Sequence, residues 1–423
     1  MNKFVNKYII KNGVSDTKAN YLWYSLGSGI FALSTLVMTI LVSRAVGEQI
    51  GGMFSIGLSI AQIFMTAAIF EVRTYQVTDV KNEFSFADYL TFRILLCILA
   101  FGISIVYVNI SGYSTFKSSV ILLLCLYKII EGLTDIFEGE FQKENRIDIS
   151  GKSMFFRTLL AVLCLAVTLF ITKNIIISLV IMNVIAVISL IVNNIIPVKY
   201  FAKISITSEV KKLGKIFIYC GPLAMSNFIN TYIINSSKLA IDKTMSDEYQ
   251  LYYSAVFMPN MVINLFSGII FKPMQTSMAQ SYNNGEIKKF SKVIFKMIGI
   301  IIGFTIICII GAYLVGIPVL SLLYGVELKP YKMVLIVLLI AGGVNAINII
   351  LYYFLTVMRK QYIMVFFYSI VAVVSLLFIN KITKMYELMG AAIGYLGLVA
   401  LLMLLLTTYI LILIGKKRGK GNE

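Results

Sequence analysis

The feature that most constrains this chain is a series of twelve long apolar segments. A hydrocarbon core about 30 Å thick is crossed by roughly 20 apolar residues in a helix. Only 13% of the 423 residues are charged, whereas soluble domains carry about 25%. The sequence therefore predicts an all-α polytopic membrane protein with about twelve transmembrane helices and no large soluble domain. The segments lie near residues 21–43, 53–71, 90–110, 118–136, 154–172, 175–198, 216–237, 251–272, 293–316, 333–357, 363–380 and 389–414.

Basic residues divide unevenly between the two sides of these segments. With both termini inside, 27 of the 37 Lys and Arg residues fall on the inner side and 9 on the outer side, while Lys128 lies within the fourth span. Cytoplasmic loops of membrane proteins retain Lys and Arg. We therefore predict that both termini are cytoplasmic. Topology alone explains the formal charge of +17, so no nucleic-acid partner is expected.

The residue types that usually hold metals or catalyse reactions are scarce. The chain has no histidine, and its five cysteines lie far apart inside apolar stretches, without the spacing of metal ligands. We expect no metal and no cofactor, and any coupling to H⁺ or Na⁺ must use carboxylates. The predicted outer loops are short, which disfavours a polymerase with catalytic residues on an outer loop. The prediction is therefore a transporter and not an enzyme.

Two stretches of the sequence resemble each other. The order Ser, Arg, Ala, Val, Gly, Glu in 43–48 is similar to the order Ser, Lys, Leu, Ala, Ile, Asp in 237–242, and both precede the next span. Six spans separate the two stretches, so the halves share one orientation, as in transporters built from parallel repeats. We predict an N-terminal lobe at 1–200, a cytoplasmic linker at 201–215 and a C-terminal lobe at 216–423.

The fourth span carries an ionisable stripe. Lys128, Glu131, Asp135 and Glu138 are spaced by 3, 4 and 3 residues, which places them on one face of a helix. A charge at the centre of the bilayer costs about 2.5–3.5 kcal/mol, so intramembrane charges are functional candidates by default. We expect the stripe to face a wet cavity, with a self-neutralising pair of Lys128 and Glu131 as the alternative.

Further candidates lie at both ends of the spans and within them. Cationic residues stand near the cytoplasmic mouth and on the outer side, where each binds a phosphate group or anchors the topology by snorkelling. Amides at helical spacing either join helices or bind sugar hydroxyls. These cationic candidates are Arg73, Lys272, Arg44 and Lys238, and the amide candidates are Asn227, Asn260 and Asn264.

Three blocks of residues resemble the bacterial O-antigen and capsular polysaccharide flippases. The first runs from Glu71 through Asp79 to Arg93, the second from Asp135 to Arg157, and the third from Lys238 through Asp242 to Pro273. The family usually has a proline before the lysine of the third block, where this chain has Ser237. The C-terminal third matches only in hydropathy and size.

The resemblance implies a member of the multidrug, oligosaccharidyl-lipid and polysaccharide exporter superfamily. Its implied fold has two pseudo-symmetric six-helix lobes around a central cavity. Its implied cargo is a glycan unit on undecaprenyl pyrophosphate, moved to the outer leaflet of the bacterial inner membrane. Implied partners are this lipid-linked oligosaccharide, membrane lipids and other surface-glycan assembly proteins, and candidate sites for a coupling ion are Glu131, Asp135 and Asp242.

Three alternatives remain at this stage. A cation-coupled multidrug or small-molecule exporter and a peptidoglycan-precursor flippase belong to the same superfamily. A membrane glycosyltransferase needs carboxylates in a loop, and the acidic cluster from Asp135 to Asp148 has that composition. Lys143 and Arg146 are interleaved with it, a pattern typical of a solvated helix face.

Overall fold

Helices make up most of the chain in the computed structural model, which describes residues 17–79, 81–271, 287–358, 360 and 362–419. The described part divides into two compact units at Thr231 and Tyr232, within one long helix. The first unit contains α2 (Thr17–Val46), α3 (Glu48–Ile69), α4 (Val72–Thr78), α5 (Phe86–Ile110), α6 (Thr115–Lys143), α7 (Ile147–Thr172), α8 (Ile175–Leu190), the π-helical turn η3 (Ile191–Ile195), α9 (Ile196–Val198) and the first part of α10 (Val210–Thr244).

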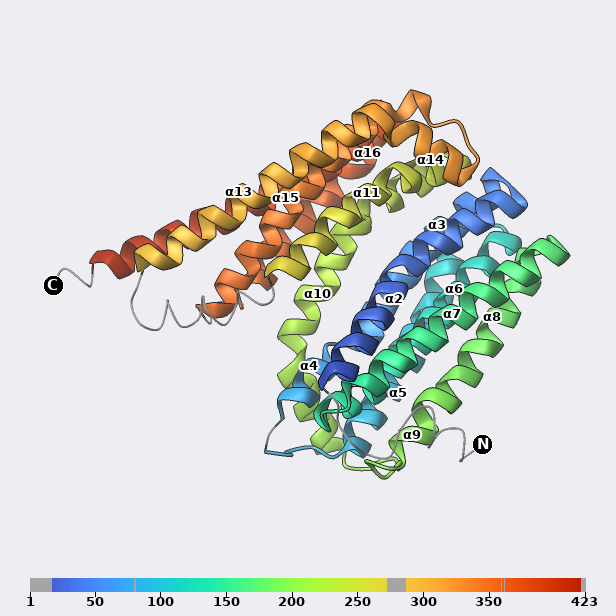
Figure 1. Ribbon diagram of the computed structural model, residues 1–423, viewed down its shortest axis with the longest axis vertical. Helices are drawn as coiled ribbons and strands as arrows, with labels where there is room; N and C mark the ends of the chain where they lie inside the picture. Colours follow the sequence, from blue (N-terminus) through green and yellow to red (C-terminus); the bar gives the residue numbers. More distant parts are fainter. Residues whose placement is uncertain (1–16, 80, 272–286, 359, 361, 420–423) are drawn as a thin grey trace. The chain divides into compact units, whose positions relative to one another are not determined.

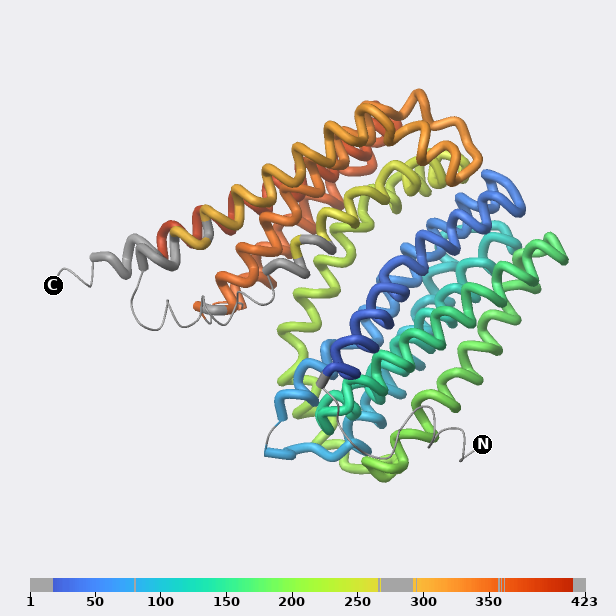
Figure 2. The backbone as a smooth tube through the Cα atoms, in the orientation of Figure 1, coloured from blue at the N-terminus to red at the C-terminus, as the bar shows by residue number. Residues whose placement is uncertain are grey.

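The second unit holds the rest of α10 and the helices that follow. These are α11 (Asp247–Phe271), α13 (Ile287–Gly311), η4 (Ala312–Gly316), α14 (Ile317–Tyr324), η5 (Lys329–Tyr331), α15 (Lys332–Val357) and α16 (Ile363–Gly419). The α16 segment is interrupted by non-helical backbone at Tyr386 and Glu387, so it is two helices, 363–385 and 388–419. Within each unit, long helices lie side by side (Figures 1 and 2).

Every predicted apolar segment lies in helices, apart from residues 70 and 71 between α3 and α4, and the residue at 272, which lies outside the described residues. Eight helices of the described chain are long and apolar enough to cross a membrane, with α16 counted once. The remaining predicted spans lie in α6, α10 and α11, which carry most of the predicted site residues. The all-α, multi-pass fold is therefore confirmed.

The connections are shorter than hydropathy predicts. The loops expected at 44–52 and 238–250 shrink to Gly47 and to the two residues between α10 and α11. Gly47 has a φ of +89°, a conformation that glycine adopts without strain. The segment 199–209 is non-helical and overlaps the predicted linker at 201–215, whose role as a lobe boundary stays a prediction.

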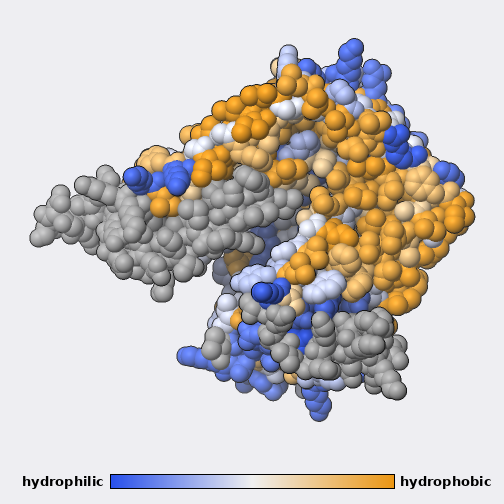
Figure 3. Space-filling model, viewed as in Figure 1, coloured by the Kyte–Doolittle hydropathy of each residue, from blue (hydrophilic) through white to orange (hydrophobic). Residues whose placement is uncertain are grey.

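Apolar side chains cover the outward faces of the helices. On α5, for example, Leu95, Ile98, Leu99 and Val106 are all exposed. Figure 3 shows such residues along the helix surfaces, with hydrophilic residues mainly toward the helix ends. Soluble monomers rarely expose apolar patches of this extent, and a bilayer supplies the matching surroundings.

The α2 and α7 helices cross at two glycines. A Cβ atom on Gly27 would collide with the backbone of Gly151, and one on Gly151 would collide with the backbone of Trp23. Small residues allow helix backbones to approach closely in membranes. This contact fixes α7 beside α2 and so orients the basic residues on the inner face of α7.

Candidate functional site

The candidate site of the first unit is built on the polar face of α6. This helix begins after Ser114, whose side chain accepts a hydrogen bond from the backbone N–H of Lys117. The face predicted from the 3-4-3 spacing points into the unit, since Lys128, Glu131 and Glu138 are buried. The face is turned away from lipid, which is expected because a charge in the hydrocarbon core is costly.

Lys128 and Glu131 form an internal ion pair. The Nζ atom of Lys128 lies 2.6 Å from Oε2 of Glu131, and the two side chains are only 3% and 2% exposed. The ammonium group also lies 5.4 Å from the ring centroid of Phe31 and 5.5 Å from that of Tyr127. The structure thus shows the self-neutralising pair that was the alternative for Lys128 and Glu131. Their roles in substrate binding or ion coupling stay predictions.

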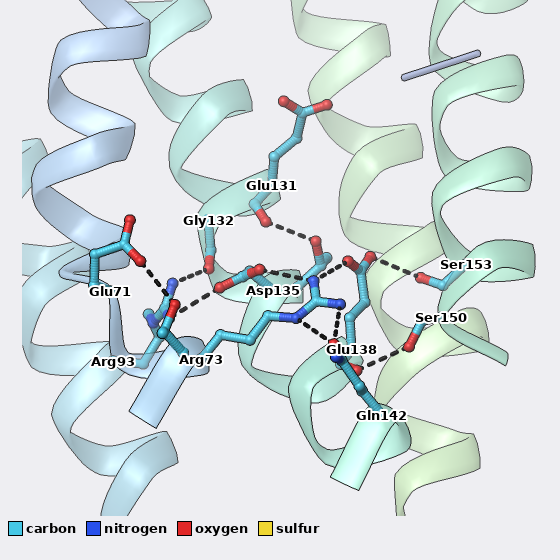
Figure 4. Close-up of polar contacts among 12 residues, drawn as sticks. Glu71, Arg73, Arg93, Glu131, Gly132, Asp135, Glu138, Gln142, Ser150 and Ser153 are labelled. Carbon is cyan, nitrogen blue, oxygen red and sulfur yellow. Dashed lines mark hydrogen bonds and ion pairs between the residues drawn. The ribbon is translucent and has the colours of Figure 1, made fainter. Parts of the chain in front are cut away.

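Arg73 lies at the centre of a second group, shown in Figure 4. Its Nη1 atom is 3.0 Å from Asp135 and 3.4 Å from Glu138. Its Nη2 and Nε atoms donate to Oε1 of Gln142 at 2.9 and 3.3 Å. The side chains of Arg73 and Asp135 are 16% and 19% exposed, so they are the accessible members of this group.

Two further arginines support the same carboxylates from neighbouring helices. Arg93 on α5 donates to Asp135 at 3.1 Å and to the carbonyl oxygen of Gly132 at 2.8 Å. Arg157 on α7 donates to Glu138 at 2.9 Å and makes a short hydrogen bond to Thr134. We call Arg73, Arg93, Arg157, Asp135 and Glu138 the arginine cluster.

The arginine cluster has one cation more than it has anions. Asp135 binds both Arg73 and Arg93, and Glu138 binds both Arg73 and Arg157. If Arg73 turns away, Asp135 therefore still binds Arg93, and Glu138 still binds Arg157. A guanidinium group suits bidentate contact with phosphate oxygens. The guanidinium group of Arg73 can thus move from the two carboxylates to an anionic ligand.

The backbone before Arg73 is bent by two residues in the left-handed region. Phe70 has φ +46° and Glu71 φ +54°, a conformation that costs non-glycine residues energy and persists where surrounding contacts impose it. Here the ring of Phe70 stacks on that of Phe217 at 5.2 Å. Oε1 of Glu71 accepts from the side chain of Asn227 at 2.6 Å. The bend turns α4 across α6, where Gly139 leaves room for Gln76.

The loop after α4 is closed by Asp79. Its carboxylate accepts from the backbone N–H of Glu83 and Phe84 at 3.0 and 3.1 Å and from the hydroxyl of Tyr89 at 2.8 Å. Burial alone raises the pKa of a carboxyl, but these three hydrogen bonds prevail and lower the pKa of Asp79 below its ordinary 3.8. The loop therefore holds Asp79 as a carboxylate at neutral pH.

Sequence reasoning missed two members of the arginine cluster as site residues, Arg93 and Arg157. Each was counted among the basic residues of the inner side and ended a resembling block, yet each lies three residues inside a predicted apolar segment, 90–110 or 154–172. An arginine within a span is itself a functional signal. Applied to every span, that rule finds both.

The other predicted site residues lie apart from this cluster along the chain. Arg44 is exposed in the last turn of α2, where a cation suits the helix dipole. Asp242 is half-buried near the end of α10. Lys238 is buried and lies 4.8 Å from the ring centroid of Phe257. Lys272 falls outside the described residues.

The predicted amides of the second unit bond to one another. Nδ2 of Asn264 donates to Oδ1 of Asn260 at 2.9 Å, and Nδ2 of Asn345 donates to Oδ1 of Asn264 at 3.1 Å. Gly342 on α15 leaves room for the Asn260 side chain. These bonds join α11 to α15, so the contacts favour the helix-packing alternative. Sugar binding by Asn260 and Asn264 stays a prediction.

Comparison with known proteins decides the family. A model of the polysaccharide biosynthesis protein family matches residues 50–333, two thirds of the chain. The chain belongs to the polysaccharide biosynthesis protein family. The match includes the whole arginine cluster and Lys238. The resemblance expected from the sequence is therefore confirmed.

Individual relatives agree with this family. The capsular polysaccharide biosynthesis protein CapF of Staphylococcus aureus is 22% identical over 307 residues, covering 72% of this chain and 76% of that protein. A MATE family multidrug resistance transporter of the MOP superfamily aligns with a TM-score of 0.67 at 12% identity, over 98% and 99% of the two chains. The lipid II flippase MurJ aligns with a TM-score of 0.70 at 12% identity, over 92% and 87%.

The two structural likenesses extend along 98% and 92% of this chain. The two solved structures show that this chain has the fold of those transporters. The prediction of a transporter in place of an enzyme agrees with that fold.

Proposed function

We propose that this polysaccharide biosynthesis protein is a flippase for a glycan repeat unit linked to undecaprenyl pyrophosphate. It moves this unit from the cytoplasmic to the outer leaflet of the bacterial inner membrane by alternating access, for capsule or O-antigen assembly. Both termini are cytoplasmic in this proposal. The family match supports the class of cargo, and the capsular relative supports the biosynthetic role.

The observation that carries the proposal is the extra cation of the arginine cluster. A diphosphate that leaves water must regain hydrogen bonds and counter-charge, because a buried unpaired anion is very costly. Arg73 is partly exposed and shares both carboxylates with Arg93 and Arg157. It can turn to a diphosphate while Asp135 and Glu138 each keep one arginine.

The same exchange suggests how an ion is coupled to transport. When Arg73 leaves, Asp135 loses one of its two cations, and its affinity for H⁺ or Na⁺ rises. We propose Asp135 as the first candidate for coupling, followed by Glu131 and Asp242. No cofactor is part of the proposal.

The test begins with deletion of the gene in its own host. A probe that reaches only the outer surface then measures which leaflet holds the undecaprenyl-linked glycan. Accumulation on the inner leaflet with loss of surface glycan supports a flippase. Normal surface glycan with altered drug tolerance refutes it in favour of a small-molecule exporter, and a block in lipid II export refutes it in favour of a peptidoglycan-precursor flippase.

Complementation then tests the arginine cluster. Arg73→Gln should accumulate as folded protein but restore little surface glycan, since each carboxylate keeps one arginine and only the exchangeable cation is lost. The matched control is Lys203→Gln, which removes one exposed charge from the connection at 199–209 and should restore export. Equal export by the two variants at equal protein level removes Arg73 from the mechanism.

A further inference from the structure

The second unit contains a buried lysine without a counter-charge. Lys238 is 8% exposed, and among the described residues it forms no ion pair and donates no hydrogen bond, although Asp242 lies one turn along the same helix. Its one described polar contact is with the face of the Phe257 ring, 4.8 Å away. An ammonium group has three N–H donors, and an aromatic ring supplies no oxygen acceptor for them.

Snorkelling toward the nearer helix end does not explain this position. Lys238 lies six residues before the end of α10, and Phe257 ten residues after the start of α11. At a rise of about 1.5 Å per residue, the backbone of Phe257 is about 6 Å deeper than that of Lys238. Side chains tilt toward the N-terminus of their helix, so the Lys238 side chain is directed away from the nearer end.

The residues around Lys238 add further unsatisfied donors. The hydroxyl groups of Ser237 and Tyr253 are buried close to each other, and neither has a hydrogen-bond partner outside this pair in the described chain. Ser237 adjoins the lysine in the chain, and the ring of Tyr253 lies 5.8 Å from that of Phe257, the ring that the ammonium contacts. Buried polar groups in proteins normally have partners.

We propose that Lys238, Ser237 and Tyr253 form an anion site that takes the oxygens of a phosphate or diphosphate group. The charge and the excess of donors over acceptors both call for a ligand that is rich in acceptors. Lysine binds phosphate as a point charge, and the Phe257 ring closes one side. This inference rests on the proposed function, because it assigns a second contact for the diphosphate of the lipid-linked substrate.

The experiment measures the thermal midpoint of the purified full chain in detergent, at constant ionic strength, against inorganic pyrophosphate, farnesyl diphosphate and chloride. A ligand that binds the folded state raises the midpoint in a saturable way. We expect both diphosphates to stabilise the wild type and chloride to have no saturable effect. Stabilisation by farnesyl diphosphate alone assigns the site to lipid-linked diphosphates, and stabilisation by both assigns it to any diphosphate.

The decisive variants are Lys238→Met and Lys243→Met. Lys243 is an exposed lysine of the same helix and serves as the matched control. The first variant should bind at least about tenfold more weakly, and the control should match the wild type. Wild-type affinity in Lys238→Met, or no stabilisation of the wild type, overturns the proposal.

A second variant can be measured if Lys238→Met does not fold. Tyr253→Phe removes one donor at nearly constant volume and should also weaken binding, and unchanged affinity in this variant counts against the site. The purified chain can bind diphosphate through Lys238 even if deletion of its gene leaves surface glycan normal. That pair of results supports the anion site and refutes the flippase. The two proposals therefore fail separately.

Discussion

Lys128 and Glu131 should behave as a unit when they are substituted. At the 2.6 Å separation of Nζ and Oε2, two unit charges attract by about 6 kcal/mol at an effective dielectric constant of about 20. Desolvation of both ions offsets much of this attraction, but removal of one partner leaves the other charge buried, which costs about 3–5 kcal/mol. We therefore expect Lys128→Met and Glu131→Met each to destabilise the protein by that amount.

The double variant Lys128→Met/Glu131→Met should recover most of the loss. It leaves no stranded charge, and a buried ion pair replaced by apolar residues is often neutral in stability. The coupling energy of the double-mutant cycle should be at least about 2 kcal/mol. Strict additivity of the two single losses would refute the pairing argument. Lys203→Met, which removes an exposed charge, is the control and should leave stability unchanged.

The free cysteines supply the assay. All five are unpaired, and Cys97, Cys125 and Cys220 are buried, so a thiol-reactive dye reports their exposure as the protein unfolds in detergent. A loss of 1 kcal/mol lowers the midpoint by about 2–4 °C in a unit of 150–250 residues. Each single variant should therefore unfold on the order of 10 °C lower, and the double variant within a few degrees of the wild type.

Export by the same variants separates structure from function. If the pair serves only to neutralise itself, the double variant exports glycan once it is folded. If Lys128 also contacts the substrate, the double variant is stable and inactive.

Three further substitutions test the packing around the sites. Gly151→Leu should prevent accumulation of folded protein, at a cost above about 3 kcal/mol, because its side chain meets the backbone of Trp23, whereas Gly29→Leu, with open space around it, should be tolerated in fluorescence-detected size-exclusion chromatography. Asn264→Leu should lower stability by about 0.6–1.7 kcal/mol in the cysteine assay through loss of inter-helix amide bonds. The pKa of Asp79 is lowered below 3.8, so its stabilising effect is present above that pH and is lost as the pH falls through the lowered pKa. Hydrogen exchange of the backbone amides at 83 and 84, which Asp79 binds, should show this acid sensitivity in the wild type but not in Asp79→Ala.

The positions of the helices could be predicted because hydropathy is a local property. Each apolar segment must bury about 20 residues in lipid, and this requirement is readable without knowledge of neighbours. The loop lengths could not be read in the same way. Helices continue past the apolar stretch wherever polar or charged residues keep a helical backbone, as α2 does through Arg44 to Val46.

The candidate site was predictable only in part. The 3-4-3 spacing identifies the polar face of α6, since the helical period fixes which residues share a face. The partners of that face come from α4, α5 and α7, up to 65 residues away, and no local period encodes such pairing. The same limit explains why Asn260 and Asn264 could be read either as sugar contacts or as links between helices.

The two units differ in how their buried charges are paired. In the first, Asp135 and Glu138 share three arginines, so all the charges are paired and Arg73 remains exchangeable. An anion that binds there replaces existing acceptors, and the net gain in affinity is the difference between two similar sets of bonds. In the second, Lys238 has no described acceptor, so an anion that binds there forms bonds that no protein group has to give up. The affinity for a diphosphate should therefore fall more in Lys238→Met than in Arg73→Gln. The ratio of these two losses of affinity measures how far pairing within the protein weakens an arginine as a phosphate ligand.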